Sequence, residues 1–96
     1  MIAPVVHMNG SNGQELLDNV LKAAKAVETA FEAVVKTCPH GRDYYLSASV
    51  HPGGAIGHAM DEYMVRKTRL QAIYKDLTGI AEIIQEQLDA KAAQRL

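Results

Sequence analysis

Residues 13–37 read GQELLDNVLKAAKAVETAFEAVVKT, and the spacing of their apolar side chains decides the fold. Apolar residues recur at every third or fourth position, which is the period of an α-helix that buries one face against a neighbour. The members of this seam are Leu17, Val20, Ala24, Val27, Phe31, Val34 and Cys38. The seam predicts a helix over residues 13–37 that packs lengthwise against another helix, with Cys38 as the last residue of the core.

Signals at both ends support this helix. Ser11 followed by Gln14 has the spacing of a capping box, in which two side chains satisfy backbone donors at a helix start. Pro39 lacks a backbone N–H and cannot continue a helix, and Gly41 lets the chain turn after it. We therefore expect the first helix to begin just after Ser11 and to end before Pro39.

A second helix is predicted from about Ala55 or Gly57 to about Ala92. Its seam consists of Tyr63, Lys67, Leu70, Tyr74, Leu77, Ala81, Ile84 and Leu88. Lys67 is unusual in a seam, because its ammonium must reach water or find an acceptor. Gly79 costs roughly 1 kcal/mol relative to alanine inside a helix, which suggests that another backbone passes close to it.

The two helices predict an all-α fold, an antiparallel helical hairpin over residues 13–92 with a loop at 39–57. Residues 1–12 are expected to form an N-terminal arm or short edge strand, since they are rich in β-branched residues and contain Pro4. Further apolar stripes flank both seams, and a two-helix core is small for 96 residues. We therefore expect a homo-oligomer, a dimer or larger, in which hairpins form a helix bundle.

Composition narrows the possible partners. The net charge of -1 disfavours binding to duplex nucleic acid, although a single nucleotide needs only one or two cations. With Cys38 alone, no internal disulfide can form, which suits a reducing cytoplasm. No apolar run has the length of a membrane span, and the N-terminus does not resemble a signal peptide. We expect a cytoplasmic protein without a membrane partner.

The loop holds the most site-like segment, Gly41-Arg42-Asp43-Tyr44-Tyr45. The guanidinium of Arg42 suits a phosphate or carboxylate, Asp43 can accept a hydrogen bond from a sugar or base, and the tyrosines can stack on a base. The alternative is a plain helix-joining loop held by its own Arg42–Asp43 pair.

Other candidate groups lie outside this segment. Arg66 and Arg69 are three residues apart on the second helix and could meet a phosphate, although their default role is in pairs along a solvated face. Residues 52–57 superficially resemble a glycine-rich phosphate loop ahead of a helix start. The histidines and Cys38 lack zinc-site spacing and no nucleophile elbow is present, so we expect no metal, no cofactor and no enzyme activity.

The segments His-Met-Asn-Gly-Ser at 7–11, Leu16-Leu17, and Gly-Arg-Asp-Tyr-Tyr at 41–45 resemble a widespread family of small bacteriophage proteins. This family is similar to phage sponges of the anti-CBASS type, which bind cyclic dinucleotide signals and withhold them from a host effector. The resemblance implies that Gly41 to Tyr45 bind the ligand, with Asn9 and Ser11 near the site. It also implies that the protein acts in the cytoplasm of the host cell.

Chemistry and resemblance together predict a non-catalytic protein that sequesters a small cyclic nucleotide. Arg42 would pair with a phosphodiester, while one of Tyr44 and Tyr45 would stack on a base and the other would pack on the bundle. Two alternatives stay open. The chain could be an oligomeric adaptor or inhibitor that docks a host protein, or a small nucleotide hydrolase that uses a metal.

Overall fold

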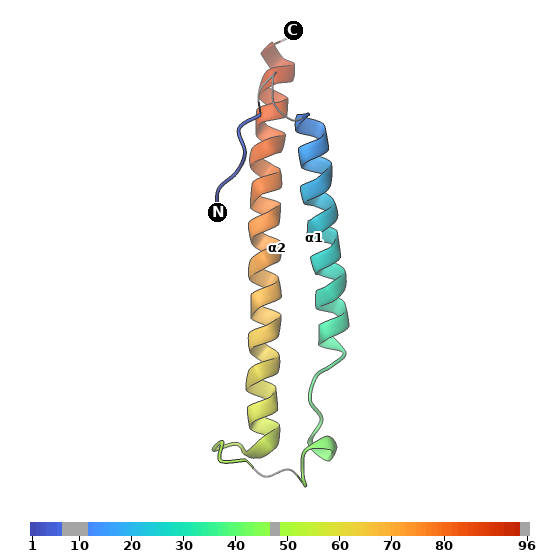
Figure 1. The fold of residues 1–96 in the computed structure, drawn as a ribbon, viewed down its shortest axis with the longest axis vertical. Helices are drawn as coiled ribbons and strands as arrows, with labels where there is room; N and C mark the ends of the chain where they lie inside the picture. Colours follow the sequence, from blue (N-terminus) through green and yellow to red (C-terminus); the bar gives the residue numbers. More distant parts are fainter. Residues whose placement is uncertain (7–11, 47–48, 95–96) are drawn as a thin grey trace.

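The computed structural model describes residues 1–6, 12–46 and 49–94. The chain forms helix α1 (Gly13–Val35), a short 3-10 helix η1 (Gly41–Asp43) and helix α2 (Gly54–Gln94). Figure 1 shows α1 and α2 side by side and antiparallel, with η1 and the connecting loop at one end of a rod of 67 × 19 × 19 Å. The predicted all-α helical hairpin is confirmed.

The start of α1 differs from the predicted capping box. Asn12 is the N-cap, and its Oδ1 accepts hydrogen bonds from the backbone N–H groups of Gln14 (2.8 Å) and Glu15 (3.3 Å). The Gln14 amide donates to Asp18 Oδ1 at 2.9 Å. Ser11 lies outside the described residues. Asparagine is as good a cap as serine, so the helix start was predicted correctly although the capping residue was not.

The end of α1 corrects the prediction for Cys38. The helix ends at Val35, and the N–H groups of Lys36, Thr37 and Cys38 bond to carbonyls three residues back. This tighter winding turns the chain away from the seam, so Cys38 is exposed and is not part of the core.

The core is small, and its central cluster, Val6, Leu17, Ala81 and Ile84, lies where the N-terminal half of α1 meets the C-terminal half of α2. Within the described ranges, the buried hydrophobic side chains are Val6, Leu17, Ala24, Tyr63, Ala81 and Ile84. Partly buried Leu16, Val20, Ile80 and Leu88 surround the central cluster. The predicted seams are therefore largely confirmed, although most seam residues are only half-buried because each helix has a single neighbour.

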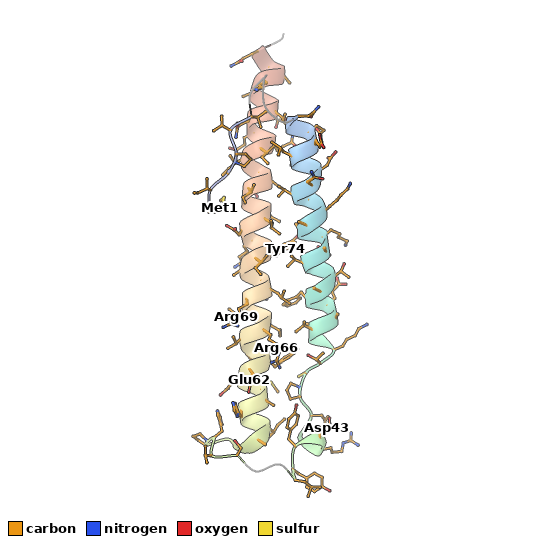
Figure 2. All side chains as sticks on the ribbon, viewed as in Figure 1. Met1, Asp43, Glu62, Arg66, Arg69 and Tyr74 are labelled. Atoms are coloured by element: carbon orange, nitrogen blue, oxygen red, sulfur yellow. The ribbon has the colours of Figure 1, made fainter. Side chains whose placement is uncertain are left out.

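The N-terminal arm (residues 1–6) lies along α2, without strand geometry (Figure 1). Gln87 holds it at two points: its Oε1 accepts from the Val6 N–H at 2.7 Å, and its Nε2 donates to the Pro4 carbonyl at 3.0 Å. A Cβ at Gly79 would lie 3.2 Å from Met1 Cε, so the close neighbour is a side chain of the arm and not a backbone (Figure 2).

The ammonium of Lys67, a cation within the apolar seam, contacts the faces of two aromatic rings. Its Nζ lies 5.2 Å from the ring centroid of Tyr63 and 5.9 Å from that of Phe31. Both distances fall within the range of a cation–π interaction. Tyr63 in turn donates from its hydroxyl to the Val35 carbonyl at 3.1 Å, which ties the end of α1 to α2 next to the loop. Neither α1 nor α2 contains a segment apolar enough over sufficient length to cross a membrane.

Candidate functional site

Helix η1 gives the Gly41–Asp43 segment a defined shape. His40 Nδ1 accepts from the Arg42 N–H at 3.2 Å, and the Asp43 and Tyr44 N–H groups donate to the carbonyls of His40 and Gly41. The side chains of Arg42 and Asp43 are therefore not needed to hold the turn. Both residues are exposed, and no ion pair joins either of them to another described residue. The loop is not held by an Arg42–Asp43 pair.

A cavity of about 290 Å³ lies between the loop and the first turns of α2. This loop cavity is lined by Tyr44, Ser49, Ala55, His58, Ala59, Glu62 and Arg66. Tyr44 and Arg66, which are 22 positions apart in the sequence, thus share one open pocket. An aromatic ring and a guanidinium beside one cavity are suited to a planar, anionic ligand.

The two tyrosines have different environments, but not quite as predicted. Tyr44 is half-buried and lines the loop cavity, whereas Tyr45 is 77% exposed and does not pack back on the helices. The prediction assumed an extended backbone, in which neighbouring side chains point to opposite sides. The preceding residues instead form the 3-10 turn of η1, so Tyr45 projects into solvent.

Charge in the loop cavity is centred on Glu62. Its Oε1 lies 2.9 Å from His58 Nε2, and its Oε2 lies 3.8 Å from Arg66 Nη1. All three residues are on successive turns of α2, and Figure 2 places Glu62 and Arg66 on the helix near the loop end that carries Asp43. The Arg66 contact is long and its side chain is half-exposed, so its remaining donors are available to an anion.

His51 anchors the loop to α2, a role that the sequence did not indicate. Its Nδ1 accepts from the Gly53 N–H at 3.0 Å, so a neutral ring carries its proton on Nε2, which lies 2.6 Å from Asp61 Oδ2. The ring also stacks on His58, with centroids 5.7 Å apart and planes 6° from parallel. The sequence places His51 and Asp61 ten residues apart across a turn, a separation with no helical or strand period that could have paired them.

In the glycine-rich segment at 52–57, which resembles a phosphate loop only superficially, three backbone donors are already bonded to nearby acceptors. The Gly53 N–H donates to His51 Nδ1, the Gly54 N–H donates to the His51 carbonyl, and the Gly57 N–H donates to the Gly53 carbonyl. These donors are therefore used internally. Gly54 is needed for another reason, since its φ of +74° is a backbone conformation that other residues adopt at a cost.

Among the predicted site residues that the structure describes, Tyr44 and Arg66 line the loop cavity, whereas Gly41, Arg42, Asp43, Tyr45 and Arg69 do not. Arg69 is exposed on α2 and does not line the cavity, although Arg66 does. Asn9 and Ser11 lie outside the described residues.

Among residues 1–6, 12–46 and 49–94, no three His, Cys, Asp or Glu side chains are grouped to hold a metal ion. Comparison with protein-family models, curated proteins and solved structures finds no match to this chain. The resemblance to phage sponges therefore stays a prediction. The argument for function depends on the geometry of the loop cavity.

Proposed function

We propose that the loop end of the hairpin binds and sequesters a small cyclic nucleotide without converting it. The observation that carries this proposal is that Tyr44 and Arg66 line one open cavity, while Arg42, two residues before Tyr44, is exposed. Stacking of a base on an aromatic ring contributes roughly 1–3 kcal/mol, and a guanidinium pairs with a phosphate through two parallel hydrogen bonds. Together these groups match a ligand that carries both a base and a phosphodiester.

The size of the loop cavity points to shared binding by the cavity and the loop surface. Its volume of about 290 Å³ is at the lower end of the range of roughly 300–1,000 Å³ for small-molecule pockets. One base or one phosphate would enter it beside Tyr44, and the rest of a cyclic dinucleotide would lie over the loop. Arg42 and Tyr45, both exposed there, would then contact the second phosphate and the second base.

Sequestration requires tight binding and no reaction. A sponge lowers the free concentration of its ligand by mass action, so it must be abundant in the compartment where the signal is made, the cytoplasm of the host cell. A nanomolar dissociation constant corresponds to about 12 kcal/mol. Glu62 opposes this affinity, because its carboxylate lies beside the proposed phosphate site and must be held away from the ligand by His58 and Arg66.

The proposal is tested by following the fate of the ligand. Purified protein is mixed with cyclic dinucleotides, separated from free ligand, heated to release what is bound, and the supernatant is analysed by chromatography. We expect the protein to take up the ligand and to release it unchanged. Cleaved products would show a hydrolase instead, and the absence of uptake would contradict the proposal.

The second candidate is an adaptor that docks a protein. Apolar side chains that remain exposed along the hairpin favour it, among them Leu21, Val35, Ile73 and Tyr74. The same side chains support our proposal of a homo-oligomer, because six buried hydrophobic side chains are few for a chain of 96 residues. An oligomer that takes up no nucleotide would favour the adaptor.

A further inference from the structure

One flank of the hairpin carries two hollows between α1 and α2. The first, of about 380 Å³, is lined in part by Phe31, Gln71, Tyr74 and Lys75. The second, of about 280 Å³, is lined by Leu17, Leu21, Thr78, Ala81, Glu82 and Gln85. Along α2, the residues that line the first hollow and those that line the second recur at intervals of four and three. They therefore lie on one side of the helix. We call this flank the groove face: Leu21, Gln71, Lys75, Thr78, Glu82 and Gln85.

The α2 row of the groove face is complementary to itself. Read from Gln71 to Gln85 it runs Gln, Lys, Thr, Glu, Gln, with Thr78 in the middle. When a second copy is turned end for end about Thr78, glutamine meets glutamine, and Lys75 of each copy meets Glu82 of the other. Lys75 and Glu82 are exposed, and in the described part of the chain neither of their side chains forms an ion pair or a hydrogen bond.

The side chains of α1 are arranged in the same way about a centre at Leu21, which lies level with Thr78 along the hairpin. Leu21 lines the same hollow as Thr78, so the two residues face each other across the hairpin. Asp18 lies three residues before Leu21 and Lys25 lies four residues after it, again opposite charges on either side of the centre. Leu21 itself is 47% exposed, an apolar side chain at the middle of the groove face. A single two-fold axis near Leu21 and Thr78 would therefore bring opposite charges together on both α1 and α2.

We propose that the groove face is the interface between two copies of this chain, related by a two-fold axis that passes near Leu21 and Thr78. Each Lys75 pairs with the partner copy's Glu82, and the two Leu21 side chains meet at the axis. Because Leu21 and Thr78 lie at the edge of the second hollow that is nearest the first, Tyr74 on the border of the first hollow is placed over the second hollow of the other copy. The result is an antiparallel four-helix bundle with an isologous interface.

This geometry leaves the loop cavity free. The axis lies in the C-terminal half of α2, so the loops of the two copies point to opposite ends of the dimer and extend beyond the partner's helices. The loop cavity is lined by Ala55, Glu62 and Arg66, none of which belongs to the groove face. The interface therefore stands or falls independently of ligand binding.

Charge reversal tests the interface, measured by sedimentation velocity at about 50 mM salt, where exposed charges are weakly screened. Lys75→Glu and Glu82→Lys each replace two attractions by two repulsions, so we expect each to raise the dimer dissociation constant about tenfold or more. An equimolar mixture of the two variants, and the double variant K75E/E82K, should regain dimerisation near the wild-type level. Circular dichroism should show unchanged helicity throughout.

The matched control is Asp76→Lys, which also turns an exposed acid on α2 into lysine but lies one residue round the helix from Lys75, off the groove face. It should leave the dimer intact. The proposal is overturned if the wild-type protein is a monomer at low micromolar concentration, if the mixture of the two variants stays monomeric, or if Asp76→Lys dissociates the dimer as strongly as Glu82→Lys.

Discussion

At the scale of single residues, Tyr63 joins the end of α1, just before the loop, to α2. Its ring packs under the Lys67 ammonium, and its hydroxyl donates to the Val35 carbonyl. Burial raises the pKa of the Tyr63 phenol above its ordinary value of 10.0, and the neighbouring Cys38 thiol adds to the increase. The folded protein therefore holds the phenol in its neutral form more strongly than the unfolded chain does.

This shift predicts a specific loss of stability in alkali. Below about pH 10 the stabilisation is complete, and it is lost as the pH rises through the raised pKa, because the unfolded phenol ionises first. Tyr63→Phe should remove that part of the pH dependence. The measurement is the urea midpoint from pH 8 to pH 11.

Tyr45→Phe provides the control, because Tyr45 is 77% exposed. It should keep the wild-type decline in alkali. If Tyr63→Phe declined as steeply as the wild-type protein, the buried phenol would not be the titrating group.

Residue-scale predictions from the sequence succeeded where one side chain dictates one role. The requirement that Lys67 find a partner was correct, and the partner is a pair of rings, which a sequence cannot place. The prediction that Cys38 belongs to the core was wrong, because it extended the apolar seam past the last turn of α1. His51 was missed because its contacts depend on the path of the loop, which follows no period.

At the scale of elements, Gly79 in α2 and Gly13 in α1 differ in their surroundings. Gly79 lies in the middle of α2, and among the described residues the close neighbour of an added Cβ is the terminal methyl of Met1, the end of a long, flexible side chain. Gly13 starts α1 in the core, where an added Cβ would lie 2.7 Å from Leu88 Cδ2 and 2.8 Å from Val6 Cγ1. Space for a methyl group exists at the first position and not at the second.

Gly79→Ala should therefore stabilise the hairpin by about 0.5–1 kcal/mol, since alanine is the better helix former and Met1 can move aside. Gly13→Ala should destabilise it by about 1–3 kcal/mol through overpacking. Both values follow from urea unfolding monitored by circular dichroism. A loss of stability in Gly79→Ala would mean that the arm is held more rigidly against α2 than its two hydrogen bonds to Gln87 imply.

The long elements were predictable because their apolar period persists over many turns. Predicted helices at 13–37 and about 55–92 compare with Gly13–Val35 and Gly54–Gln94. Helix η1 was not predicted, since three residues carry no period and its turn depends on the His40 side chain as a cap. The same limit applies to the loop cavity: the sequence indicated Tyr44 and Arg66 separately, and only the turn at η1 brings them to one pocket.

At the scale of the whole molecule, the core, the loop cavity and the groove face lie in different parts of the rod. The arm, Leu17 and Ile84 concentrate the core at one end, and the loop cavity lies at the other. This separation explains how an exposed, polar loop can be tolerated in a small protein, because the core does not depend on it. We therefore expect substitutions in the loop to leave the helices folded.

The most direct measurement is isothermal titration of a cyclic dinucleotide into the double variant Arg42→Ala/Arg66→Ala, beside the wild-type protein and Arg69→Ala. Our account predicts that the double variant loses at least 100-fold in affinity, about 2.7 kcal/mol. Arg69→Ala, which removes one positive charge outside the cavity, should bind like the wild-type protein. Equal loss in Arg69→Ala, or full binding by a helical double variant, would contradict the assignment of the loop cavity as the ligand site.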